Sequence, residues 1–286
     1  MTRRPFVLLG LAAVSVLGAF AVWLAAFYVR GGGALDGRAL EAFTGVARPP
    51  LRPRILGLAS LADPLPFAVA AVGLVAIAVL RRRWLMAAVV PSILLAANLA
   101  TQQLKPALAD LRVFDIHGAP ALYPGSWPSG HSTAAMSLAL CLVIVAGPRW
   151  RPLAALAGAG YAIAVGYSLV VLGFHLPSDV LGGFLVAATF ALSGAAALAF
   201  AESREPAEAP SPTPAAPPLR PPGILSAPAL ALLTLGAIGA AGLVVVAAAP
   251  GATADVVDHP VAVLAGIGIA VLGLTLTAGL ARVLRR

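Results

Sequence analysis

His175 and Asp179 are the most informative pair in the sequence, because their types and spacing suit a nucleophilic histidine. They are four residues apart, and Pro177 between them is typical of the first turn of a helix. One helical turn brings positions i and i+4 onto one face, so the Asp179 carboxylate can accept the proton of one imidazole nitrogen. The other nitrogen is then oriented and more nucleophilic. The alternative is structural: a capping aspartate beside a boundary histidine. A metal site is not indicated, because the sequence has no cluster of three ligands with the usual spacing.

A second motif, Pro128-Ser129-Gly130-His131, lies directly before an apolar stretch. Ser129 is a favourable N-cap, and Gly130 leaves room for another group to approach the backbone. The exposed N–H groups at the start of a helix attract anions. The motif therefore indicates either an anion site with His131 beside it or an ordinary helix cap with an incidental histidine.

Two cations precede this motif. Lys105 ends an apolar stretch, and Arg112 follows it by seven residues. Each has a structural explanation by itself. Lys105 would extend its side chain to the interface from a helix C-terminus, and Arg112 would be a solvated loop charge. On the same membrane side as the two histidines, however, both cations would help to neutralise a bound anion.

The elements that must position these residues are membrane helices. Hydrophobic residues make up 60% of the chain and charged residues only 10%, which predicts an all-α, polytopic membrane protein. About 20 apolar residues are needed to cross the roughly 30 Å of hydrocarbon. Eight such stretches are expected, at residues 5–28, 63–80, 84–104, 132–147, 153–173, 180–201, 225–249 and 261–281.

Arginines in the connections predict the orientation. With eight spans, the basic residues before the first span, after the second, between the fourth and fifth, and at the C-terminus all fall on one side. This side is expected to be the cytoplasm, so both termini are cytoplasmic and the two histidine motifs face outward. The loop 29–62 opposes this assignment, because it carries five arginines and lies outside. Its segment 35–43 is expected to form an amphipathic helix on the membrane surface.

Four regions are expected along the chain. Residues 1–58 hold an outer loop and a transmembrane anchor, for which a signal peptide is the alternative. Residues 59–201 form the membrane core with all the polar motifs. Residues 202–223, rich in Pro, Ala, Glu and Ser, form a cytoplasmic linker, and residues 224–286 form a two-helix transmembrane hairpin. The net charge of +8 follows from the arginine asymmetry and requires no nucleic-acid partner.

Taken in order, these residues resemble the type 2 phosphatidic acid phosphatase family, which shares its helical core with vanadium haloperoxidases. The pattern is Lys-x6-Arg, then Pro-Ser-Gly-His, then Ser-x6-His-x3-Asp. The resemblance implies a six-helix phosphatase-like core, here with two additional transmembrane helices. It also implies a role for each motif residue: Lys105 and Arg112 hold phosphate oxygens, Ser129 and Gly130 bind phosphate through side chain and backbone, His131 protonates the leaving group, His175 attacks phosphorus, and Asp179 orients His175.

Two positions depart from the family pattern. Val113 replaces the proline that usually follows the first arginine, and Leu169 replaces the arginine that usually follows the serine of the third motif, here Ser168. The second departure is the serious one, because leucine lacks the charge and the paired donors of a guanidinium. The loss of this guanidinium is expected to weaken transition-state stabilisation by several kcal/mol, unless Arg30, Arg38 or another outer-loop arginine replaces it.

The expected function is the hydrolysis of a lipid phosphate monoester or diphosphate at the outer face of the cell membrane, without a metal or other cofactor. The resemblance implies a phosphohistidine intermediate. Phosphatidate, phosphatidylglycerol phosphate and polyprenyl diphosphate stay open as substrates. No partner besides the lipid phosphate and the bilayer is predicted, and the sequence does not determine the oligomeric state. Two other classes stay open: a lipid-phosphate-binding pseudo-enzyme, which Leu169 favours, and a transporter, which would need ionisable groups near the bilayer midplane.

Overall fold

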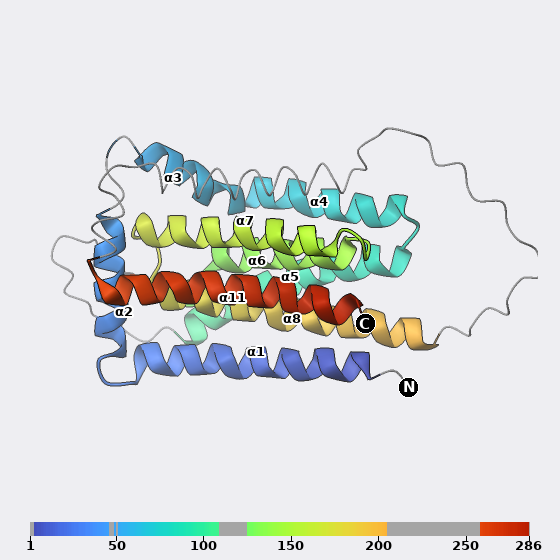
Figure 1. Cartoon of the computed structure of the whole chain (residues 1–286), viewed down its shortest axis with the longest axis horizontal. Coiled ribbons are helices and arrows are strands. Elements are labelled where there is room, and N and C mark those ends of the chain that lie inside the picture. Colours follow the sequence, from blue (N-terminus) through green and yellow to red (C-terminus); the bar gives the residue numbers. More distant parts are fainter. Residues whose placement is uncertain (1–2, 46–48, 50, 109–124, 205–257, 286) are drawn as a thin grey trace, which may run out of the picture.

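The computed structural model describes residues 3–45, 49, 51–108, 125–204 and 258–285, and these residues form helices joined by short connections (Figure 1). Seven of the eight expected spans are helical over most of their length. They are α1 (Arg4–Phe27), α4 (Pro64–Leu80), α5 (Trp84–Ala107), α6 (Gly130–Val145), α7 (Arg151–Val171), α8 (Pro177–Arg204) and α11 (Pro260–Arg285). The expected span 225–249, linker residues 205–223, and Arg112 with Val113 lie outside the described residues.

The segment before α4 is more helical than the expected loop. It contains α2 (Gly32–Thr44), α3 (Arg52–Ala59) and the short 3-10 helix η1 (Ser60–Ala62). The helix α2 contains the predicted amphipathic segment 35–43 and buries Leu40 and Phe43 on one face. The segment Arg52–Ala62 meets α4 at an angle of 49°, so the second predicted span is the second arm of a bent helix pair.

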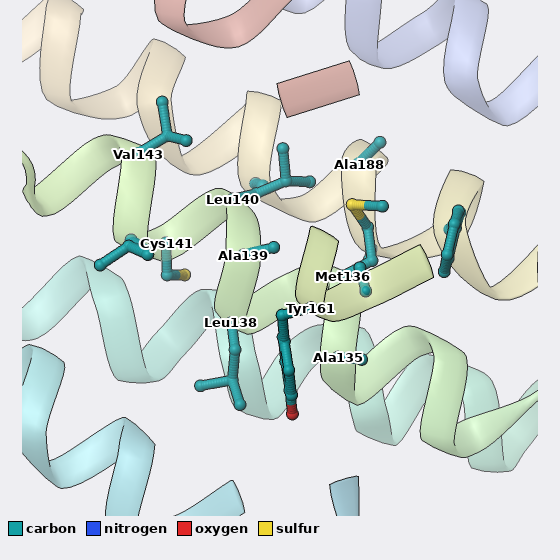
Figure 2. Close-up of a cluster of buried hydrophobic side chains, with 14 of the residues drawn as sticks. Ala135, Met136, Leu138, Ala139, Leu140, Cys141, Val143, Tyr161 and Ala188 are labelled. Atoms are coloured by element: carbon teal, nitrogen blue, oxygen red, sulfur yellow. The ribbon is translucent and has the colours of Figure 1, made fainter. Parts of the chain in front are cut away.

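Helix α6 is the centre of the bundle. With 16 residues it is too short to span the bilayer alone, since an α-helix rises about 1.5 Å per residue. Every residue from Ser132 to Val145 is buried, because α4, α5, α7, α8 and α11 all pack against this helix. Figure 2 shows Met136, Leu140 and Cys141 of α6 in this core, with Tyr161 of α7 nearby. Surrounding protein therefore replaces lipid along α6.

Small residues allow these helices to approach closely. A Cβ added at Gly158 of α7 would lie 3.0 Å from the Cβ of Ala139 in α6. One added at Gly273 of α11 would lie 2.8 Å from Ile163 of α7. Such contacts are typical of helix packing in membranes, where van der Waals contact rather than the hydrophobic effect drives association. Through them α11 packs directly on the core.

The two ends of the bundle differ in chemistry. The N-terminus of α1 and the C-terminus of α11 lie at one end, together with the end of α4 and the start of α7 (Figure 1). This arginine-rich end holds the basic residues on which the topology prediction rests. The starts of α6 and α8 lie at the opposite end of the bundle, where α5 and α7 finish (Figure 1). The protein is thus a multi-pass helical membrane protein with its histidine motifs gathered at one end.

Candidate active site

The starts of α6 and α8 are bonded to one another. The backbone N–H of Ser129 donates to the carbonyl oxygen of Asp179 at 3.0 Å. The indole N–H of Trp127 donates to the carbonyl oxygen of Ser178 at 3.2 Å. A Cβ at Gly183 would lie 2.7 Å from the carbonyl oxygen of Ser129, so only glycine permits this approach. These contacts bring two motifs that are separate in the sequence into one site.

His175 and Asp179 form the predicted i, i+4 pair. Nδ1 of His175 lies 3.3 Å from Oδ2 of Asp179, and the same oxygen accepts the Leu176 backbone N–H at 3.2 Å. The Asp179 side chain is fully buried, whereas 12% of the His175 side chain is exposed. When Nδ1 donates to the carboxylate, Nε2 carries the free lone pair of the ring. The geometry suits an oriented nucleophile, and Asp179 also caps its own turn.

Ser129 and Gly130 begin α6 as expected. The Ser129 hydroxyl oxygen accepts the Ser132 N–H at 3.3 Å, so Ser129 is the N-cap. A Cβ at Gly130 would lie 3.9 Å from Nζ of Lys105 and 3.6 Å from Nε2 of Gln102. The C-terminal turn of α5 therefore brings an ammonium group and an amide to the start of α6. The sequence motifs did not indicate Gln102 as a site residue, although it lies three residues before Lys105 and therefore on the same helix face.

His131 has a partner that the sequence motifs did not indicate. Its Nε2 lies 2.9 Å from Oδ1 of Asp63, and both side chains are partly exposed. Asp63 lies at the bend between η1 and α4, where it occupies the N-cap position of α4. The only sequence signal for Asp63 is an acid at the start of an apolar stretch, on the predicted outer side. Asp63 therefore contacts the His131 imidazole from the start of α4, a helix separate from α6 and α8.

A second carboxylate reaches the site from the N-terminal segment. Oδ1 of Asp36 in α2 accepts the Ser178 backbone N–H at 3.1 Å, and Oδ2 accepts the Ser178 hydroxyl. An acidic group is favourable at the start of α8, where free N–H groups and the helix dipole concentrate positive charge. The side chains of Phe43 and Tyr167 stack with their centroids 6.3 Å apart, which ties α2 to α7 as well. The amphipathic helix therefore packs against the site end of the bundle.

Leu169 is part of the apolar core. Its side chain is 1% exposed, and its carbonyl oxygen accepts the Phe174 N–H at 2.9 Å in the turn before His175. Arg30 and Arg38, the suggested replacements for the family arginine, are exposed. Neither makes a hydrogen bond or ion pair with a described motif residue. Lys105 is thus the one motif cation that the described part of the site contains.

An apolar groove of about 540 Å³ lies between α1, α5 and α8. Its lining includes Phe20, Leu104, Phe190 and Trp127. Trp127 also bonds the first turn of α8, and Leu104 directly precedes Lys105. The groove therefore adjoins the polar site along two shared segments, an arrangement that suits an amphiphile with its polar group at the histidines.

No three His, Cys, Asp or Glu side chains are grouped as metal ligands within the described ranges.

Comparisons with known proteins agree with the helical fold. Residues 84–204 match the model of the PAP2 superfamily. No curated protein matches the chain. Among solved structures, the fold is similar to that of a protein described as the first transmembrane PAP2 type phosphatidylglycerolphosphate phosphatase, from Bacillus subtilis. The TM-score is 0.55 at 20% identity, over 71% of this chain and 98% of that chain. The match over α5 to α8 and the similar fold both agree with the resemblance that the motifs indicate.

Proposed function

We propose that the protein hydrolyses a lipid phosphate, with His175 as the nucleophile. The observation that carries this proposal is the His175–Asp179 pair, in which a buried carboxylate engages one ring nitrogen beside the start of α6. Phosphoryl transfer depends mainly on positioning and charge neutralisation. Lys105, the Gly130 N–H and the Ser129 hydroxyl proton are the groups that would hold the phosphate oxygens, with Arg112 as a further cation.

The proposed reaction has two steps. Nε2 of His175 attacks phosphorus, the bond to the lipid oxygen breaks, and His131 gives that oxygen a proton. Water then attacks the phosphohistidine, His131 accepts a proton from this water, and inorganic phosphate leaves. Asp179 stabilises the charge that develops on His175. Asp63 would restrict the ring of His131 through the 2.9 Å contact.

The lipid part of the proposal rests on the groove between α1, α5 and α8. Its apolar lining would accept acyl chains while the phosphate reaches Lys105. The structural neighbour is named as a phosphatidylglycerolphosphate phosphatase. We therefore propose a diacylglycerol-based phosphate monoester, phosphatidylglycerol phosphate or phosphatidate, ahead of a polyprenyl diphosphate. The site is proposed to face the outer side, with both termini in the cytoplasm.

Leu169 supports a second candidate function. The position of the family arginine is filled by a buried leucine, and no described arginine makes a hydrogen bond or ion pair with a described motif residue. A protein with this site would bind a lipid phosphate and turn it over slowly or not at all. This is the pseudo-enzyme alternative.

The deciding experiment measures phosphate release by the purified full-length protein in detergent, with phosphatidylglycerol phosphate, phosphatidate and farnesyl diphosphate offered separately. We expect release from a diacyl substrate, and the same rate with a metal chelator present. Loss of activity in chelator would contradict the metal-independent reaction. Binding of a lipid phosphate without release from any substrate would establish the pseudo-enzyme instead.

A further inference from the structure

A second groove lies at the opposite end of the bundle from the histidines. It is formed by the first turns of α7 and the last turns of α11 and has a volume of about 450 Å³. Its lining is mainly apolar and includes Pro152 and Leu156 of α7 and Leu274 and Ala278 of α11. All four of these residues are exposed, so the groove is open along the side of the bundle.

Two arginines line the same groove. Arg282 and Arg285 belong to the last turn of α11, and a spacing of three residues places them on one helix face. Both are exposed, and neither makes a hydrogen bond or ion pair with any residue that the structure describes. Their charges therefore lie at the end of an apolar surface without a described counter-charge.

Four other arginines at this end are already engaged. Arg151 donates to the Leu284 carbonyl oxygen, and Arg81 donates to the Val145 carbonyl oxygen at 2.8 Å. Glu202 forms ion pairs with Arg83, at 3.1 Å, and with Arg4, at 3.8 Å. Of the acids in the described ranges, Glu202 is the one at this end of the bundle. The surroundings of Arg282 and Arg285 are thus strongly positive and favour an anion.

We propose that this groove binds an anionic phospholipid. One acyl chain would lie against Leu156 and Leu274, and the lipid phosphate would meet Arg282 and Arg285. Guanidinium groups bind phosphate oxygens through paired hydrogen bonds, and basic pockets between membrane helices suit acidic headgroups. The lipid would bridge α7 and α11, so its binding stabilises the association of α11 with the core. This site is independent of the proposed hydrolysis.

The two arginine charges favour a lipid as the occupant of the groove over another helix of the same chain. The predicted span 225–249 is apolar and contains no ionisable residue. Such a helix would cover the apolar lining but would leave both arginines without a counter-charge. A lipid that is acidic at one end and apolar at the other matches both parts of the groove.

The first test measures the Tm of the purified full-length protein in neutral detergent with added phosphatidylglycerol or phosphatidylcholine at equal mole fraction. We expect phosphatidylglycerol to raise the Tm by several degrees more than phosphatidylcholine, because a ligand that binds only the folded state stabilises it. The double variant Arg282→Gln, Arg285→Gln should lose this difference. The matched control, Arg38→Gln with Arg54→Gln, removes two exposed arginines near the other end and should keep it.

A second test locates the lipid and does not depend on the stability of the arginine variants. A phosphatidylglycerol with a photoreactive group in one acyl chain should label peptides from the first turns of α7 and the last turns of α11. Leu156→Trp, which fills the groove, should abolish this label. Equal effects of both lipids, a phosphatidylglycerol preference that survives the arginine substitutions, or no label at this groove would each overturn the proposal. Absence of label is also the result expected if residues 225–249 cover the groove.

Discussion

At the scale of single residues, the site rests on two His–Asp pairs with different partners and different exposure. His175 is held by a fully buried aspartate in the first turn of α8, the helix that follows it, whereas His131 contacts an aspartate at the start of another helix, at a more exposed position. A nucleophile must have its lone pair fixed toward phosphorus, whereas an acid must exchange protons with water between steps. The two environments agree with the two roles that we propose.

His175→Ala is expected to abolish phosphate release, because it removes the ring nitrogen that we propose as the nucleophile. Activity is measured with the preferred lipid phosphate, and folding is checked by the Tm. A variant that keeps more than about a tenth of wild-type activity has lost less than about 1.4 kcal/mol and would exclude His175 as the nucleophile. Asp179→Asn should also reduce kcat strongly, since it removes the charge that stabilises the imidazolium.

Asp63→Asn is expected to impair the protonation step that we assign to His131. With a lipid phosphate, whose alkoxide is a poor leaving group, kcat should fall by about tenfold or more, as when general acid catalysis is weakened. With an aryl phosphate such as 4-nitrophenyl phosphate, the loss should largely disappear, because that leaving group needs no proton. His131→Ala should show the same dependence. An equal loss with both substrates would mean that Asp63 acts only on the structure of the bend.

Leu169→Arg tests whether the site is a weakened enzyme. If one phosphate-binding cation is missing, the new guanidinium should raise kcat/KM, and a tenfold gain corresponds to about 1.4 kcal/mol of transition-state binding. Because Leu169 is buried, the charge is expected to lower the Tm unless a phosphate compensates it. Leu169→Met is the size-matched control. A fall in activity would indicate that another arginine already occupies the space, whereas binding without release would favour the pseudo-enzyme.

At the scale of helices, the first turns of α6 and α8 must lie close enough for their backbones to bond. Gly183 makes this possible, since its missing Cβ would lie 2.7 Å from the Ser129 carbonyl oxygen. Backbone cannot move aside as a flexible side chain can, so the helices themselves would have to separate. Catalytic geometry and helix packing thus depend on the same glycine.

Gly183→Ala is expected to separate α6 from α8, lowering stability by about 1–3 kcal/mol and reducing activity further through the misplaced phosphate site. Gly279→Ala in α11 is the matched control, because an added Cβ there meets nothing within 4 Å. Alanine has the higher helix propensity, so this control should leave stability unchanged or slightly raised. Thermal unfolding and phosphate release are measured for both variants. Equal behaviour of the two would contradict the packing argument.

At the scale of the whole molecule, the bundle separates an arginine-rich end from a histidine-containing end. The arginines belong to helix ends that are far apart in the sequence yet lie at the same end of the bundle (Figure 1). This is the distribution expected when basic connections stay in the cytoplasm during insertion. It predicts that the site faces outward.

Cysteine labelling tests this orientation. In a Cys141→Ser background, Ala34→Cys in α2 and Ser203→Cys in α8 each place one thiol at an exposed position, at opposite ends of the bundle. In intact cells, a membrane-impermeant maleimide should label position 34 and spare position 203. Both should react after permeabilisation, which controls for thiol reactivity. The reverse pattern in intact cells would place the histidines on the cytoplasmic side.

The sequence by itself determined the membrane class, most helix positions and the residues of both histidine motifs. These features are local: apolar length specifies a span, and cap residues specify where α6 and α8 begin. The contact of His175 with Asp179 is also local, because only four positions separate them at the start of α8. The match to the PAP2 superfamily confirmed the resemblance drawn from these residues, whereas their roles stay predictions.

Only the tertiary structure decided which distant residues meet. Asp63 lies 68 positions from His131, and Asp36 lies 142 positions from Ser178, so no local period relates them. Their contacts depend on the bend before α4 and on the packing of α2 across the end of the bundle. The burial of the short α6 was decided in the same way, by the helices that surround it. Such contacts arise from the packing of whole helices, which the local pattern of apolar and polar residues does not specify.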